Sequence, residues 1–112
     1  MFAFEIPGMR FSLPAGGAVK RHRFVSVNSD SKGTQATATT PIVGVAMNEA
    51  AANEVLEIAD GIVMVEAGAA ITAGAAVYAD ADGKAAVSGT IQAGIAITGA
   101  SGAGEIITVK IN

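Results

Sequence analysis

Residues 41–61 read PIVGVAMNEAAANEVLEIADG, and residues 90–112 read TIQAGIAITGASGAGEIITVKIN. Small or apolar residues and one glutamate recur in the same order in both stretches: Ile42, Gly44, Ala46, Ala50, Glu54 and Ile58 in the first, and Ile91, Gly94, Ala96, Ala100, Glu105 and Val109 in the second. The two stretches therefore indicate one ancestor or one shared geometry.

The correspondence continues upstream, where RFVSVNSDSKG at residues 23–33 matches AAVYADADGKA at residues 75–85. A repeat that is present only twice favours one pseudo-twofold β unit, because solenoids need three or more copies to cover their faces. We therefore predict a single β domain over residues 18–112, with two halves at about 23–61 and 75–112 that pack on each other.

The apolar residues are of the kind that β structure prefers. The chain holds 22 valines and isoleucines against 2 leucines, and branching at Cβ suits a pleated surface. Glycine-containing turns separate the apolar runs at the spacing typical of sandwiches and barrels. We expect an all-β protein, a small barrel or sandwich of about eight or nine short strands. Its 24 alanines make the core thin, which favours oligomerisation.

Residues 48–61 are ambiguous, because Asn48 could cap an alanine- and glutamate-rich helix that ends at Gly61. The matching segment of the second copy is TGASGAGEIITVKI, and its glycines are incompatible with a helix. We therefore predict a loop followed by a strand from Glu54.

The first seventeen residues differ from the rest and predict an extended N-terminal arm. Three of the four phenylalanines lie here, at Phe2, Phe4 and Phe11, and Pro7 and Pro14 interrupt the strand-like alternation. Exposed phenylalanine is costly, so this arm either folds back on its own barrel or lies on a neighbouring molecule.

The net charge of −3 is unevenly distributed. Residues 1–29 carry a net charge of +3, whereas residues 30–112 carry −6. A basic run at Lys20–Arg23 could neutralise phosphates, but the acidic total, the single tyrosine and the lack of tryptophan argue against nucleic acid as a direct partner. An acidic protein surface is the preferred partner. The apolar stretch at residues 67–79 is too short to cross a bilayer, so no membrane partner is expected.

Candidate catalytic and metal-binding residues are few. The one histidine, His22, lies between two arginines with no acid nearby in sequence to orient it, and the chain has no cysteine. The sequence DADG at Asp80–Gly83 resembles the start of a calcium loop but has Ile91 where the terminal glutamate should stand. We expect no enzymatic activity, no bound metal and no cofactor.

Lys84 gives the one alternative function. Its turn is similar to the lysine hairpin of lipoyl and biotinyl carrier domains, which are also small pseudo-twofold β units. Gly83 departs from the residue that those domains usually hold before the lysine, and Lys32 occupies the matching turn of the first copy.

From about Gly17 to the C-terminus, the chain resembles the small capsid cement, or head-decoration, proteins of tailed bacteriophages. The resemblance depends on the order of PIVGVAMNEAAANEVLEIADGIVMVEAGAAITAGAAVYADADGKA and IQAGIAITGASGAGEIITVKIN. It implies a non-enzymatic protein of the virion that is made in the bacterial cytoplasm and binds the outer capsid surface, commonly as a homotrimer. It also implies that the protein stabilises the shell by bridging major capsid subunits.

The N-terminal region is the least family-like part of the chain, and we place the capsid contact there. The candidate contact residues offer apolar anchors and positive charge: Phe2, Phe4, Ile6, Arg10, Phe11, Lys20, Arg21 and Arg23. An extended arm with this composition could pair with an exposed sheet edge of the partner.

Overall fold

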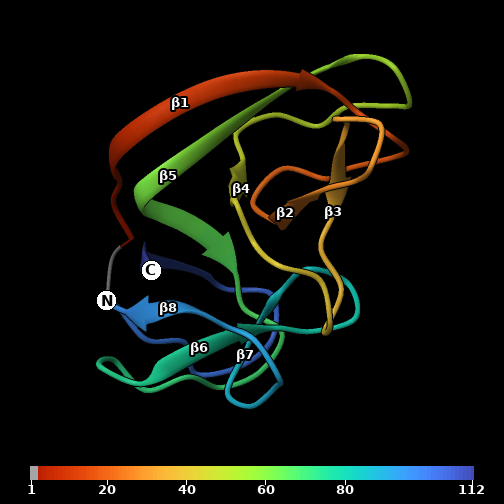
Figure 1. Cartoon of the computed structure of the whole chain (residues 1–112). Coiled ribbons are helices and arrows are strands. Elements are labelled where there is room, and N and C mark those ends of the chain that lie inside the picture. Colours follow the sequence, from red (N-terminus) through yellow and green to blue (C-terminus); the bar gives the residue numbers. More distant parts are fainter. Residues whose placement is uncertain (1–2) are drawn as a thin grey trace.

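The computed structural model describes residues 3–112, the side chain of Pro7 excepted, and this part of the chain forms nine strands and no helix (Figure 1). The strands are β1 (Ile6–Pro14), β2 (Phe24–Val27), β3 (Gly33–Gln35), β4 (Gly44–Ala46), β5 (Val55–Glu66), β6 (Ala76–Ala79), β7 (Ala85–Ala86), β8 (Gln92–Ala96) and β9 (Ile106–Ile111). The all-β prediction is confirmed.

The strands make one antiparallel sheet that curls into a half-barrel, in the order β3-β2-β4-β5-β9-β8-β6-β7. The long strand β5 joins the two halves: its first part pairs with β4 and β1, and its second part pairs with β9. In Figure 1, β1 and β5 run side by side along one flank, while β6, β7 and β8 lie at the opposite end.

The two sequence repeats have the same pattern of strand pairing. The pairings β2–β3, β2–β4 and β4–β5 of the first half recur as β6–β7, β6–β8 and β8–β9 in the second. Two bridges outside the strands also recur, since Ala15–Gly33 and Val19–Ala50 correspond to Ala67–Ala85 and Ile71–Ala100. The structural match therefore begins at Ala15 and Ala67, upstream of the starts that the sequence alone suggested.

The core is built mainly from valine, isoleucine and alanine. One cluster extends through both halves and includes Phe24, Val63, Val77 and Ile107. A smaller cluster in the first half is centred on Leu56 and Ile58. Phe24 and Leu56 are the largest fully buried side chains among the described residues.

The same turn chemistry shapes both halves. The Asn28 Oδ1 accepts hydrogen bonds from the Asp30 and Lys32 N–H groups, both at 3.0 Å. The Asp80 Oδ1 accepts the equivalent bonds from Asp82 and Lys84, at 2.8 and 2.9 Å. Asparagine and aspartate favour such turns because their short side chains reach the backbone two residues on.

Residues 47–54 form a loop, and β5 follows from Val55. Asn48 does not cap a helix. Its Oδ1 accepts a hydrogen bond from the Glu57 N–H at 2.8 Å, and its Nδ2 donates to the Val55 carbonyl at 3.0 Å. The side chain therefore closes the loop onto the start of β5.

Residues 6–14 fold back on the same chain. As β1 they pair with β5 from Ile6 opposite Ile62 to Pro14 opposite Val55. The register shifts between Pro7 and Met9, opposite Gly61, whose φ of 101° is a backbone conformation that favours glycine. Of the two arrangements open to the N-terminal region, these residues take the intramolecular one.

Candidate functional site

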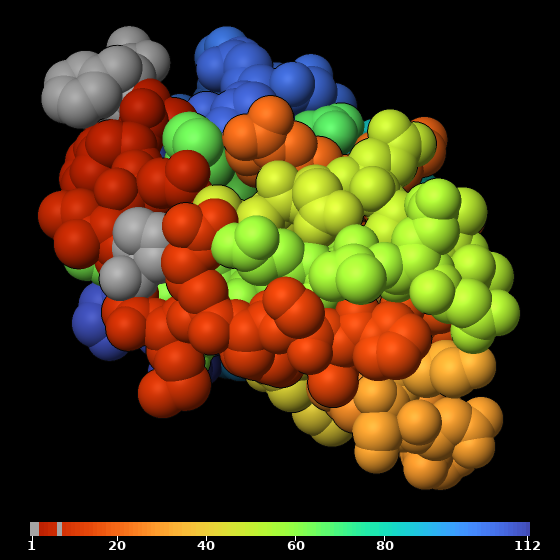
Figure 2. Space-filling model, turned by 90° about the horizontal axis from the view of Figure 1, so that it is seen from above, coloured from red at the N-terminus to blue at the C-terminus, as the bar shows by residue number. Residues whose placement is uncertain are grey.

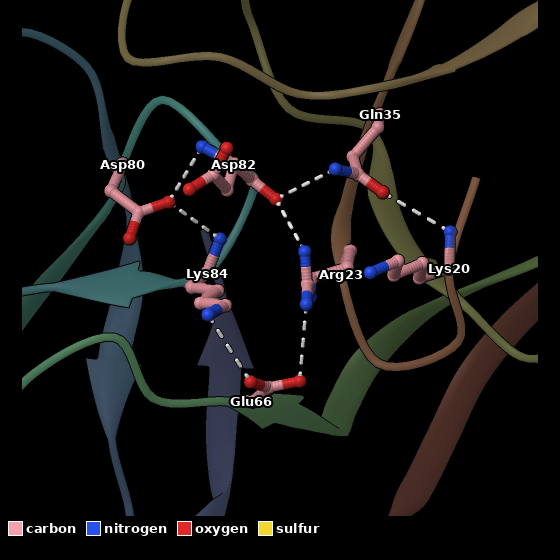
Figure 3. Close-up of polar contacts among 7 residues, drawn as sticks. All are labelled: Lys20, Arg23, Gln35, Glu66, Asp80, Asp82 and Lys84. Atoms are coloured by element: carbon pink, nitrogen blue, oxygen red, sulfur yellow. Dashed lines mark hydrogen bonds and ion pairs between the residues drawn. The ribbon is translucent and has the colours of Figure 1, made fainter. Parts of the chain in front are cut away.

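A polar cluster lies where the two halves meet, and we call it the inter-half clasp (Figure 3). It consists of Arg23, Gln35, Glu66, Asp82 and Lys84. The Arg23 Nη1 donates to the Asp82 carbonyl at 3.0 Å, and its Nη2 lies 3.3 Å from the Glu66 Oε1. The Gln35 Nε2 donates to the same Asp82 carbonyl at 2.9 Å. First-half side chains thus hold the turn at residues 80–83 of the second half.

The clasp is suited to holding the fold together. Glu66 lies between two cations, because the Lys84 Nζ is 3.5 Å from its Oε2. Arg23 is 6% exposed, and its buried Nε has no hydrogen-bond partner among the described residues. Both carboxylate oxygens of Glu66 therefore face a cation, one from each half of the chain (Figure 3).

Lys84 lies in a setting that does not suit a swinging cofactor. Its side chain is 28% exposed, and its ammonium group points to Glu66 (Figure 3). The counterpart Lys32 is likewise engaged, since its Nζ donates to the Asn53 Oδ1 at 2.9 Å. A carrier lysine must reach its modifying enzyme freely, so the geometry does not favour the carrier alternative.

His22 contributes to the fold through its backbone conformation and its backbone hydrogen bonds, and not through a catalytic arrangement of its side chain. Its φ is 63°, its N–H donates to the Ala46 carbonyl at 3.0 Å, and its own carbonyl accepts from the Glu66 N–H at 2.9 Å. Burial, followed by the nearby Arg21 charge, lowers the pKa of His22 below its ordinary value. Residues 3–112 contain no ligand-sized pocket and no cluster of His, Asp and Glu that could hold a metal ion. They also contain no helix that could span a membrane.

The predicted apolar contact residues occupy different environments. Phe2 lies outside the described residues. Phe4 is half-buried, and Phe11 packs partly buried against the smaller core cluster. Ile6 is 63% exposed. The side chains of Phe4 and Phe11 therefore contribute to the fold, whereas Ile6 faces solvent.

The predicted basic contact residues also lie in different environments. Arg10 is exposed and forms an ion pair with Glu57, the residue on β5 opposite Ser12. Lys20 and Arg21 are exposed on the loop before β2. Arg23 is buried in the clasp. Only Arg10 shares a strand with Ile6.

We group four of the exposed residues of β1 and call them together the β1 surface: Ile6, Met9, Arg10 and Ser12. Met9 is 65% exposed, and sequence reasoning missed it. Gly8, within the register shift, was the one local signal that the alternation of the strand would break there. Figure 2 shows the N-terminal segment running across one face of the molecule, next to residues of β5.

The β1 strand is also an edge. The Ala15 N–H donates to the Glu54 carbonyl at 2.8 Å, which fixes which residues of the antiparallel pair exchange hydrogen bonds. By alternation, Phe11 and Leu13 direct their backbone groups to β5, and Arg10 and Ser12 direct theirs away from it. Among residues 3–112, β5 is the only strand that pairs with β1. The arrangement therefore offers side chains and backbone groups for binding, and no reacting groups.

Comparison with known proteins agrees with this geometry. A solved structure of the head fiber gp8.5 N base in bacteriophage phi29 is similar to this chain, with a TM-score of 0.75, 20% sequence identity and 93% of each chain covered. At that identity the likeness concerns the fold. No curated protein matches the sequence.

The model of a phage cement protein family matches residues 6–111. This match confirms the resemblance seen in the order of the sequence motifs. Because it spans nearly the whole chain, the protein belongs to the phage cement protein family and is a structural, non-enzymatic component of the phage head.

Proposed function

We propose that the protein binds the outer surface of an assembled phage capsid as a homotrimer and stabilises the shell by bridging neighbouring major capsid subunits. Family membership supports a role in the phage head. The observation that carries the contact itself is the β1 surface, where Ile6 and Met9 are 63% and 65% exposed on the same strand as Arg10.

Exposed apolar side chains that cluster on one strand mark an interaction site more often than isolated ones do. Arg10 adds a positive group that suits an acidic protein surface, and Lys20 and Arg21 extend the positive charge of the N-terminal region. The partner would be a capsid subunit that presents an apolar, acidic surface. Arg23 is not part of this proposed contact, because it is buried in the inter-half clasp.

A homotrimer would make this modest surface sufficient. Once one subunit has bound the shell, the contacts of the other two become effectively intramolecular, so the overall affinity exceeds that of one contact by about 10²-fold or more. Weakening each contact a few-fold would therefore weaken the trimer by roughly the product of the single effects.

Cosedimentation with heads of the phage that encodes the chain tests the contact. Met9→Asp replaces an exposed apolar side chain of β1 with a charged one, and we expect it to reduce head binding by at least about tenfold through avidity. Val87→Asp is the matched control, since Val87 is 54% exposed and follows β7 at the far end of the sheet. Equal binding by both variants and the unmodified protein would remove β1 from the contact.

The trimer is tested separately by light scattering on the free protein and by the stoichiometry of bound protein on heads. We expect three chains per particle in solution and occupancy in multiples of three on the shell. A monomer in both measurements would contradict the homotrimer while leaving the capsid contact open to the cosedimentation test.

A further inference from the structure

One side chain of β9 makes two hydrogen bonds to the backbone of Phe4. The Thr108 hydroxyl accepts a hydrogen bond from the Phe4 N–H and donates one to the Phe4 carbonyl, both at 2.6 Å. Thr108 is fully buried, and its own N–H donates to the Thr98 Oγ1 at 2.9 Å. Residues 3–5 belong to no strand, so this hydroxyl contact replaces a strand ladder at that point.

The internal repeat shows that the fold alone does not bury this position. Glu57 is the counterpart of Thr108, because the Glu57 N–H donates to the Asn48 side chain as the Thr108 N–H donates to that of Thr98. The Glu57 side chain is 42% exposed and pairs with Arg10. Thr108, by contrast, is fully buried and is bonded to the backbone of Phe4.

We propose that Thr108 is a latch that holds residues 3–5 on β9 in the free protein, and that the latch opens when the β1 surface engages the capsid. Opening brings Phe4 to the same contact as Ile6 and Met9. The segment is suited to this exchange because β1 is anchored along eight residue pairs, whereas residues 3–5 precede it and lie outside the ladder. The opening step rests on the proposed function; the latch itself does not.

Opening the latch exchanges its two hydrogen bonds for bonds to water. Water can replace both hydrogen bonds, because the counterpart position at Glu57 is solvent-accessible. Exchanging two such bonds for water changes an equilibrium by about tenfold. The binding-competent open form would then be a minor one, and the apparent affinity for capsids would be lowered by its fractional population.

Amide hydrogen exchange of the free protein tests the latch. In Thr108→Val, which keeps the branched shape and removes the hydroxyl, we expect the Phe4 amide to exchange about tenfold faster. Thr108→Ser keeps the hydroxyl and should preserve the protection. Thr34→Val is the control, because its hydroxyl bonds to the Ser26 carbonyl in the distant pair β2–β3. Unchanged Phe4 exchange in Thr108→Val would overturn the proposal.

Cosedimentation with heads then tests the opening. Thr108→Val should bind about tenfold more tightly than the unmodified protein, because the held form no longer competes with binding. Weaker or equal binding, together with faster Phe4 exchange, would show that the segment stays on β9 in the complex and would overturn the opening step. If the unmodified protein does not bind heads, the proposed function and the opening step both fail, while the exchange experiment still decides the latch.

Discussion

Gly94 gives the sharpest test of why the glycine-apolar-alanine block occurs in both halves. It lies on β8, opposite Ile111 of β9, and a Cβ at this position would meet the Lys110 carbonyl oxygen at 2.0 Å and its carbonyl carbon at 2.9 Å. Gly44 is the equivalent residue on β4, where a Cβ would meet the Ala59 carbonyl oxygen at 2.5 Å. Both contacts are with backbone, which cannot rotate away as a side chain can.

The magnitude for Gly94→Ala follows from this geometry. Non-bonded heavy atoms pack at about 3.5 Å, so β8 would have to move by about 1.5 Å relative to β9. Such a shift weakens the two or so ladder hydrogen bonds around the site, at about 1 kcal/mol each, and adds an overpacking cost of about 1–3 kcal/mol. We expect a loss of about 3–5 kcal/mol from a total stability of roughly 5–15 kcal/mol.

Urea unfolding followed by circular dichroism measures this loss. Gly102→Ala is the matched control, because a Cβ there would meet no atom within 4 Å and the residue has no positive φ. We expect the control to stay within about 0.5 kcal/mol of the unmodified protein. If Gly94→Ala were as stable as Gly102→Ala, close strand approach would not be the reason for the repeated glycine.

Two further predictions concern the inter-half clasp and His22. Arg23→Ala leaves the Glu66 carboxylate with only Lys84 in the clasp, and we expect a loss of about 3 kcal/mol in urea unfolding, against about 0.5 kcal/mol or less for the exposed neighbour in Arg21→Ala; equal losses would contradict a structural clasp. The pKa of His22 is lowered by burial, so the unfolded chain binds a proton more readily and stability should fall as pH decreases from about 7 toward 5. His22→Asn, which tolerates the φ of 63°, should flatten the melting temperature over that range, and an unchanged slope would assign the dependence to other groups.

The sequence was sufficient for features that depend on local chemistry. Strand-forming residues and repeated turns predicted the all-β class and nearly the right number of strands, because Asn28 and Asp80 close their turns with bonds to the next few residues. The glycines after Thr98 also settled the ambiguous segment after Asn48 as a loop. In each case the interactions that decide the structure lie within a few residues of one another.

The sequence was insufficient where partners are distant. Arg23 stands in a basic run typical of an exposed surface, but its partners Glu66 and Asp82 lie 43 and 59 residues away along the chain. Likewise, Met9 lies next to a register shift against β5, and that register is set by pairing across about fifty residues, since Met9 lies opposite Asp60. No local pattern records which distant strand will receive such a residue.

One difference between the two halves explains why the edge of β1 stays open, whereas the equivalent edge of β5 is closed. The edge of β5 near Glu66 is closed by the loop of the first half, through the Glu66 N–H and the His22 carbonyl. An offset of 52 residues, set by Ala15 and Ala67, makes Pro14 the counterpart of Glu66 and Gly74 that of His22.

His22 and Gly74 share a left-handed backbone, with φ of 63° and 88°. By the symmetry of the repeat, the loop at Gly74 in the second half could approach β1 as the loop at His22 in the first half approaches β5. Pro14 has no N–H to donate, and the closing hydrogen bond cannot form. Proline protects sheet edges from pairing in this way. Arg10 and Ser12 still direct their backbone groups outward from β5. The edge of β1 is therefore not closed by the loop of the second half, and it remains available to a different partner.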